Sequence, residues 1–179
     1  MKTLVRFVIV YCVATANPIL TNGVVSAQAA DPELVRLRSM IGRWTVVETF
    51  EAQTADKREG RGTLTVRPGP GGNSVFMEYR SIAGPMKGFE LFEILSWHPG
   101  QRVFQMVYVT SFQPGMSTAT GQLDGTDVVF SRQERVGEAI VTSKSVLSDL
   151  KAGQFTLSSY EAKEGQPQRR TLVLQCTKE

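Results

Sequence analysis

The chain has 179 residues, of which 41% are hydrophobic and 21% are charged. This composition excludes a disordered or collagen-like protein. The length gives room for one well-buried core, so the fold needs no disulfide to stabilise it.

The first 29 residues predict a secretory signal peptide. Lys2 and Arg6 form a charged start, an apolar run covers residues 7–14, and Ala27 and Ala29 have the spacing of an Ala-x-Ala cleavage site. A spanning helix needs about 20 mainly apolar residues, whereas Pro18 and several polar residues interrupt this segment. We therefore expect a periplasmic or secreted protein with no stable membrane anchor and one domain over residues 30–179.

Cleavage after Ala29 also changes the charge, because it leaves 18 basic and 17 acidic residues, a net charge of +1. A nearly neutral chain without a long basic run lacks the positive surface of a nucleic-acid-binding protein. Cys176 would be the one cysteine of the mature chain, which predicts no internal disulfide and a small buried apolar residue on the last strand.

A short helix is predicted at the start of the mature domain. Asp31 suits the N-cap and Pro32 the first helical position, Leu34 and Leu37 share one face, and Gly42 ends the helix. Beyond it, apolar residues alternate with a period of two, which is typical of strands. The predicted strands cover residues 43–52, 62–67, 74–82, 88–97, 102–111, 117–123, 127–133, 139–148, 154–161 and 170–177.

The order of these elements predicts an all-β fold. Turn residues separate the strands and no helix lies between them, which leaves a sandwich or an antiparallel up-and-down barrel of about ten strands. The barrel is favoured, because closing a meander of hairpins removes exposed edge strands. Gly60 and Gly62 are predicted bulge positions.

Several motifs in chain order resemble a known family. Gly42-Arg43-Trp44 places a Gly-x-Trp on the opening strand, after Leu37 and Ile41. The later motifs are Phe76-Met77-Glu78-Tyr79, Gly84, Gly88-Phe89-Glu90, Trp97 at a turn, and Gly121-x-Leu123-Asp124-Gly125. Together they resemble the exported, lipocalin-like bacterial family of the calycin superfamily that is catalogued as a domain of unknown function. The resemblance implies a calycin-type barrel whose lumen holds a small, mainly apolar molecule.

The sequence also departs from that family. The turn after the fourth strand usually reads Tyr-Asp, whereas this chain has Trp97-His98-Pro99. A related group of ten-stranded barrels holds haem through a late histidine, and this chain has none after His98. Without that histidine, haem ligation of this kind is not expected, and we predict no cofactor.

Strand alternation predicts the residues that face the lumen, since every second side chain shares one face. On the first strand the face of Trp44 also carries Glu48, and on the third strand the row from Val75 to Tyr79 is expected inside, with Glu78 and Arg80 in solvent. The predicted ligand-binding residues are Trp44, Val46, Glu48, Phe50, Met77, Tyr79 and Leu91. Trp44 has a second interpretation, which the resemblance implies, as a plug at one barrel end.

Glu48 has three interpretations. A carboxylate in a lumen can hydrogen-bond a ligand, act as a base, or pair with an interior arginine such as Arg80 or Arg132. No catalytic residue and no metal site are predicted. His98 is the one histidine and lies in a turn, and the chain has neither metal-ligand spacing nor a serine nucleophile with a base.

The leading functional hypothesis is an exported, non-enzymatic barrel that binds a small apolar or amphipathic ligand. One alternative is an interaction or structural module whose lumen is filled by Phe50, Met77, Leu91 and Phe155. Another is an enzyme that uses an interior carboxylate. Strands 88–97 and 102–111 are apolar on both faces, so we expect the outer face to be covered by the helix or by a second subunit in a homodimer.

Overall fold

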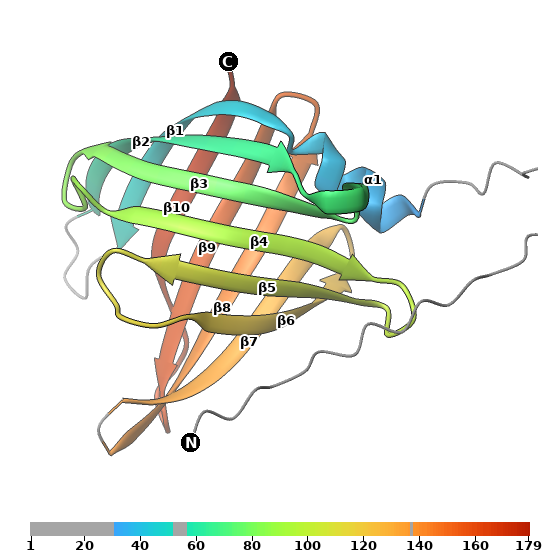
Figure 1. The fold of residues 1–179 in the computed structure, drawn as a ribbon. Helices are drawn as coiled ribbons and strands as arrows, with labels where there is room; N and C mark the ends of the chain where they lie inside the picture. The colour runs from blue at the N-terminus through green and yellow to red at the C-terminus, as the bar shows by residue number, and fades with distance from the viewer. Residues whose placement is uncertain (1–30, 52–56, 137) are drawn as a thin grey trace, which may run out of the picture.

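The computed structural model describes residues 31–51, 57–136 and 138–179, so the predicted signal peptide lies outside the described residues. The fold is a closed antiparallel barrel of ten strands preceded by one short helix (Figure 1), which confirms the predicted fold class. The elements are α1 (Pro32–Ser39), β1 (Gly42–Glu51), β2 (Lys57–Pro68), η1 (Pro70–Gly72), β3 (Ser74–Ala83), β4 (Glu90–His98), β5 (Val103–Thr110), β6 (Ser117–Asp124), β7 (Asp127–Val136), β8 (Ala139–Lys151), β9 (Gln154–Lys163) and β10 (Arg169–Lys178).

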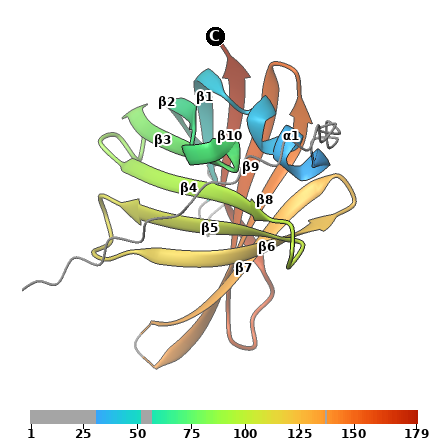
Figure 2. The same cartoon turned by 45° about the vertical axis from the view of Figure 1, so that its right-hand side comes forward.

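Each strand pairs with its neighbours in the sequence, and β1 pairs with β10 to close the barrel. A meander closed in this way leaves no open edge in the described sheet. Strands β1, β3, β5, β7 and β9 all end, and the strands that follow them begin, at the end of the barrel away from α1, which we call the hairpin end. Figure 2 shows the β7–β8 and β9–β10 hairpins extending beyond the other strands at this end.

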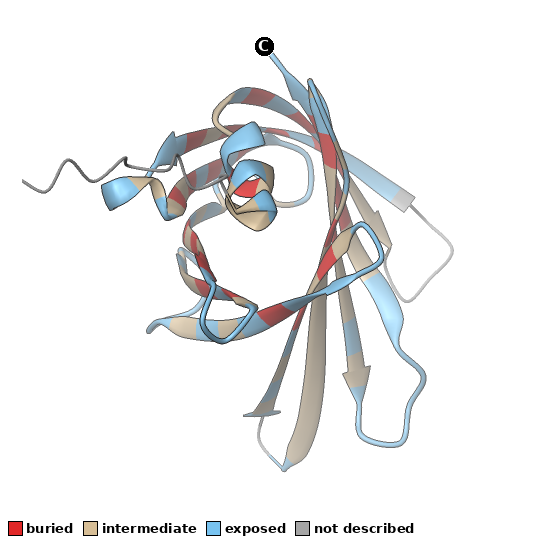
Figure 3. Ribbon diagram, turned by 90° about the vertical axis from the view of Figure 1, so that its right-hand side faces the viewer, coloured by how far each residue is buried: buried red, intermediate tan, exposed pale blue. Residues whose placement is uncertain are grey.

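Helix α1 lies across the opposite end of the barrel (Figure 3) and is held by two tryptophans. Asp31 caps the helix by accepting a hydrogen bond from the Glu33 amide at 3.1 Å. Trp97 Nε1 donates to Asp31 Oδ2 at 2.7 Å, and Trp44 Nε1 donates to the Met40 carbonyl at 2.8 Å. Indole groups of β4 and β1 therefore fix both ends of α1.

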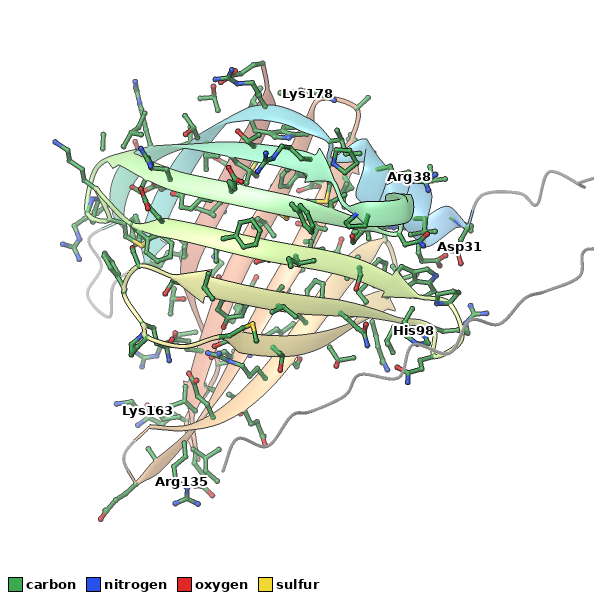
Figure 4. The ribbon with its side chains drawn as sticks, in the orientation of Figure 1. Asp31, Arg38, His98, Arg135, Lys163 and Lys178 are labelled. Atoms are coloured by element: carbon green, nitrogen blue, oxygen red, sulfur yellow. The ribbon has the colours of Figure 1, made fainter. Side chains whose placement is uncertain are left out.

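Two arginines of α1 join the helix to neighbouring turns. Arg38 donates to the Gly72 carbonyl at 2.9 Å, and Arg36 donates to the Thr126 carbonyl. Figure 4 shows Arg38 and Asp31 at this end of the molecule. Because Leu37 and Met40 are buried below the helix, α1 closes this end of the barrel with apolar side chains.

The third strand confirms the predicted inward row. Val75, Met77 and Tyr79 are buried, whereas Glu78 and Arg80 are exposed. Glu78 accepts a hydrogen bond from Arg67, and Arg80 pairs with Glu90 at 2.6 Å outside the barrel. The alternation of apolar and polar residues was therefore sufficient to orient this strand.

The second strand is longer than predicted, since β2 begins at Lys57 instead of Gly62. Its first half is charged and glycine-rich and has no apolar alternation, but it pairs with β1 through Arg58 opposite Phe50. Tertiary pairing thus outweighs weak local propensity. The pairing of β2 with β3 shifts register between Arg61 and Gly62, because Arg61 lies opposite Ala83 and Gly62 opposite Ser81. The extra residue is therefore Ile82 on β3, so the predicted bulge positions Gly60 and Gly62 lie beside the irregularity and are not the bulged residues.

The outer face of β4 and β5 stays exposed. Phe92 and Val109 are 37% and 41% exposed. Helix α1 packs near the ends of β3, β4 and β8 instead, because its tryptophan contacts fix it across the barrel end. The expectation that the helix covers this outer face is wrong, and a second subunit over it stays a prediction.

Candidate functional site in the lumen

The interior of the barrel has two parts with different side chains. The closed half, next to α1, is lined by Trp44, Val46, Leu64, Val66, Val75, Leu95, Trp97, Phe104, Val128, Phe130, Leu147, Phe155, Leu174 and Cys176. The polar half, towards the hairpin end, contains Glu48, Tyr79, Ser81, Glu93, Tyr108, Arg132, Glu134, Ser143 and Ser145. The polar half is the candidate site, because buried polar groups need partners.

Glu48 and Tyr79 form the innermost polar pair. Glu48 is 0% exposed, and the Tyr79 hydroxyl donates a hydrogen bond to its Oε1. Burial, together with the hydrogen bond to Glu48, raises the pKa of Tyr79 well above its ordinary value, so the phenol remains a donor. Glu48 Oε2 accepts no hydrogen bond from any described residue.

Two glycines of β2 make room for this pair. A Cβ atom at Gly62 would lie 2.6 Å from Cε2 of Tyr79, and one at Gly60 would collide with Oε2 of Glu48. Side chains at either position would therefore displace the carboxylate or the phenol ring. Gly60 and Gly62 therefore form the inner wall against which Glu48 and Tyr79 fit.

Glu93 is a second buried carboxyl on the adjoining wall. It is 8% exposed, and its cross-strand neighbours are Met77 on β3 and Tyr108 on β5. No hydrogen bond or ion pair found among the described residues involves its carboxylate. Burial raises the pKa of Glu93 to about 7, so this group changes charge near neutral pH.

Arg132 and Glu134 form an ion pair on β7, with 2.9 Å between Nη2 and Oε1. The Arg132 guanidinium carbon lies 5.4 Å from the centre of the Tyr108 ring, which is a cation–π contact. Arg132 Nε and Ser81 Oγ are buried and have no hydrogen-bond partner within the described chain. Each unpaired buried polar group costs about 1–3 kcal/mol, so this half is destabilising unless a bound molecule pairs these atoms.

A pocket of about 820 Å³ lies at the hairpin end, beside the polar half. Its walls are Glu51, Glu134, Val141, Glu161, Ala162, Lys163, Gln166, Pro167, Arg169, Arg170 and Thr171. Glu134 belongs to both the pocket and the polar half. Figure 4 shows Lys163, another residue of the pocket wall, near the hairpin end. The volume falls within the range of small-molecule sites.

A row of aromatic rings connects the interior with the surface. The Tyr79 and Phe89 ring centres are 6.1 Å apart, and those of Phe89 and Phe112 are 5.0 Å apart. Phe112 lies between β5 and β6 and is 67% exposed. Apolar contact is therefore continuous from the buried Glu48–Tyr79 pair to the loops of the hairpin end.

The structure separates the residues that the sequence grouped as ligand-binding. Trp44 and Val46 lie in the closed half, where the Trp44 ring meets Phe155 edge-on with centres 4.6 Å apart. This packing supports the interpretation of Trp44 as a plug. Met77 lies at the boundary of the two halves, beside Glu93.

The remaining predicted residues lie towards the hairpin end. Glu48 and Tyr79 are in direct contact, and Phe50 and Leu91 are half-buried. Neither arginine considered as a partner of Glu48 forms an ion pair with it. Arg80 points outward to Glu90, and Arg132 pairs with Glu134.

Sequence reasoning missed Glu93 and the Arg132–Glu134 pair as parts of the site. The signal for Glu93 is present in the sequence, because Glu93 alternates in phase with Leu91, Leu95 and Trp97, which share one apolar face of the strand. A single carboxyl within an inward apolar row is a strong indication of a lumenal polar group.

The remaining candidates have structural roles. His98 is exposed, and its Nδ1 accepts a hydrogen bond from the Gln101 amide at 3.1 Å, as a turn residue does. Cys176 is buried, and burial raises its pKa to about 12. Within residues 31–51, 57–136 and 138–179, no group of three or more His, Cys, Asp or Glu could hold a metal ion. No helix in the same ranges is long and apolar enough to cross a membrane.

Comparison with known proteins adds support for the fold. No family model matches the chain, and no curated protein matches its sequence. Among solved structures, the chain is similar to the crystal structure of Rv2717c from M. tuberculosis, with a TM-score of 0.54 and 13% sequence identity. The match covers 83% of this chain and 98% of the other. At this identity the similarity concerns the fold alone.

Proposed function

We propose that this protein binds a small amphipathic molecule in the polar half of its lumen. The observation that carries the proposal is the gathering of three buried, unpartnered polar atoms in that half, which are Glu48 Oε2, Ser81 Oγ and Arg132 Nε. Buried polar groups in folded proteins are almost always hydrogen-bonded. A ligand whose polar atoms pair with these groups would offset the cost of burying them.

The rest of the barrel supports this assignment. The closed half packs Trp44, Phe104 and Phe155 below the site and provides a rigid apolar floor. Of the side chains weighed for a filled barrel, Met77 and Phe155 are fully buried, whereas Phe50 and Leu91 are only half-buried. The filling is therefore complete near α1 and partial towards the hairpin end, where a ligand would enter.

The proposal extends to compartment and ancestry. We propose export to the periplasm or medium on the strength of the signal-like residues 1–29. We propose a relationship to the lipocalin-like family because Gly42 and Trp44 stand at the junction of α1 and β1, with the Trp44 indole bound to the helix end. The hydrogen bond from Tyr79 to Glu48 favours a binding role for this carboxylate over a role as a free base.

Native mass spectrometry of protein purified without denaturants, followed by solvent extraction, tests whether a small molecule copurifies. The neutral fluorescent probe N-phenyl-1-naphthylamine tests whether the lumen takes an apolar ring. We expect saturable binding of the probe with one site per chain. A folded protein that neither carries a small molecule nor binds the probe would contradict the proposal.

A pair of variants on β4 locates the probe. Leu91→Trp adds bulk at a half-buried lumenal position, and its control, Phe92→Trp, makes a similar change on the exposed outer face. We expect the lumenal variant to lose probe binding and the outer variant to keep it. The reverse result would place the probe on the outside of the barrel.

A further inference from the structure

We infer that the polar half selects a ligand with a cationic, hydrogen-bond-donating head group, such as a primary amine, and that Glu48 and Glu93 recognise it. The inference rests on the proposed function and adds the chemical class of the ligand. It follows from the balance of charge and of hydrogen-bonding capacity among the buried lumenal side chains.

The balance of charge in the polar half is negative. The charged side chains that face the lumen and are buried or half-buried in the described barrel are Glu48, Glu93, Arg132 and Glu134. Glu134 already pairs with the one cation of this group, Arg132, at 2.9 Å. Glu48 and Glu93 are therefore left without a counter-charge, and a buried carboxylate gains most from a cationic partner.

The unused hydrogen-bonding capacity consists mostly of acceptors. Tyr79 occupies Oε1 of Glu48, while Glu48 Oε2 receives no hydrogen bond from the described residues. Burial alone raises the pKa of Glu93, with no hydrogen bond among the causes. An ionised carboxylate can only accept. An ammonium group offers three donors and no acceptor, so it matches these oxygens in number and in sign.

A carboxylate head would meet the opposite conditions. Within the polar half its one cationic partner would be Arg132, whose guanidinium is already held by Glu134 and lies over the Tyr108 ring. Lys163, Arg169 and Arg170 line the pocket beside the polar half. A further carboxylate would stand among three lumenal glutamates, and like charges in a shared buried site repel. The Arg132 Nε–H remains available to an uncharged oxygen of the ligand, such as a hydroxyl.

Aromatic rings next to the carboxylates also suit a cation. The Tyr79 ring adjoins Glu48 through its hydroxyl, and the Tyr108 ring, one face of which already carries the Arg132 guanidinium, is the cross-strand neighbour of Glu93. Ring faces attract cations, and the attraction increases when the pair is desolvated. An alkyl chain attached to the amine would follow the apolar contacts of Phe89 towards the hairpin end.

Three straight-chain amphiphiles of equal length test the inference by isothermal titration calorimetry at pH 8. They are decylamine, decanol and decanoate, which share a ten-carbon chain and carry a cationic, a neutral and an anionic head group. We expect decylamine to bind roughly tenfold more tightly than decanol, the gain of one charge-assisted hydrogen bond, and decanoate to bind most weakly. Equal or tighter binding of decanoate would overturn the inference.

Variants of two glutamates on β4 assign the preference. Glu93→Gln removes the lumenal charge at nearly constant volume, and we expect it to reduce the preference for decylamine over decanol by roughly tenfold. Its control is Glu90→Gln, on the outer face, where Glu90 pairs with Arg80, and we expect it to keep the wild-type preference. Circular dichroism confirms that both variants fold. A preference that is unchanged in Glu93→Gln would refute the role of Glu93.

The three amphiphiles also separate this inference from the proposed function. If none of them binds and the neutral probe does not bind, the proposed function fails. If decanol and decanoate bind at least as well as decylamine, the lumen is a ligand site and the inference about its charge selectivity fails.

Discussion

The closed half and the polar half of the lumen are lined by the same ten strands, yet they differ in how well their side chains are satisfied. In the closed half, Trp44 and Phe155 pack edge to face, and the Trp44 indole donates to the carbonyl of Met40, the C-cap of α1. In the polar half, Glu48, Ser81 and Arg132 each keep an unpartnered buried atom. The difference indicates that the closed half supplies stability, and it is the basis for proposing the polar half as the binding site.

The two halves also make opposite contributions to the stability of the fold. Burying apolar area stabilises a fold by about 25 cal/mol per Å², and the closed half consists of such area. Burying a charge without a partner is destabilising, and Glu93 shows that cost as a raised pKa. Function in this barrel is therefore expected where local stability is lowest.

The largest effect is expected in the closed half. Trp44→Ala removes the ring that packs on Phe155 and the hydrogen bond to Met40, and we expect a loss of about 3–5 kcal/mol in the free energy of unfolding. Urea unfolding measures it. The control is Val47→Ala on the exposed face of the same strand, where a change above about 1 kcal/mol would show that the two faces are not energetically distinct.

Glu93→Gln should stabilise the protein at high pH. The Glu93 pKa is about 7 in the folded state against an ordinary value of 4.5. Between pH 4.5 and pH 7, Glu93 is therefore mostly ionised in the unfolded chain and mostly protonated in the folded protein. Stability then falls as pH rises from 4.5 to 7. We expect the variant to be more stable than the wild type by about 3 kcal/mol at pH 8 and nearly unchanged at pH 4. If the stabilities of the wild type and of Glu93→Gln, measured by urea unfolding, change in the same way with pH, the result would contradict the burial of this charge.

Gly62→Ala tests the wall behind the polar pair. The new methyl group would lie 2.6 Å from Tyr79 Cε2 and 2.8 Å from the Arg80 carbonyl oxygen, so Tyr79 must move. We expect a loss of about 1–3 kcal/mol in stability together with weaker probe binding. Gly100→Ala, with its nearest atom at 3.4 Å, is the control, and equal losses in both variants would show that the Tyr79 contact has no special importance.

Trp97→Phe tests the attachment of α1 and should have a smaller effect. The ring is kept in part, while the 2.7 Å hydrogen bond to Asp31 is lost, at a cost of about 1 kcal/mol. Hydrogen exchange of the α1 amides should become faster than in the wild type. Unchanged exchange would mean that the remaining contacts of α1, from Trp44, Arg36 and Arg38, hold the helix without the Trp97 hydrogen bond.

Phe112→Ser should have the smallest effect on stability, within about 0.5 kcal/mol, because the side chain is mostly exposed. Its ring contact with Phe89 ends the aromatic row that leads to the interior. We therefore expect slower association of N-phenyl-1-naphthylamine in stopped-flow fluorescence. An association rate equal to that of the wild type would show that the probe enters by another route.

The fold was largely predictable because its signals are local. Alternation oriented Val75 to Tyr79, and the Asp31-Pro32 start located α1. The same alternation placed Glu48 inside and carried the information that Glu93 is inside. The first half of β2 was not predictable, since the pairing of Arg58 with Phe50 is a property of the closed barrel.

The partners of the lumenal charges could not be predicted from alternation. Arg80 and Arg132 were both possible partners of Glu48. Strand register determines whether a side chain faces the lumen or the solvent, but it does not determine which of the lumenal side chains touch one another. The Tyr79 hydroxyl reaches Glu48 because Gly60 and Gly62 leave space across β2. A contact across an intervening strand depends on the curvature of the barrel, which the local sequence pattern does not specify.

The most direct test of ligand binding in the polar half is a methyl NMR titration with N-phenyl-1-naphthylamine and ¹³C-methyl-labelled methionine. Met106 faces the lumen beside the polar half, whereas Met40 is sealed below α1 in the closed half. We predict a saturable shift of the Met106 methyl signal with the Met40 signal unchanged. Shifts confined to the exposed Met116, with Met106 unaffected, would contradict a binding site in the lumen.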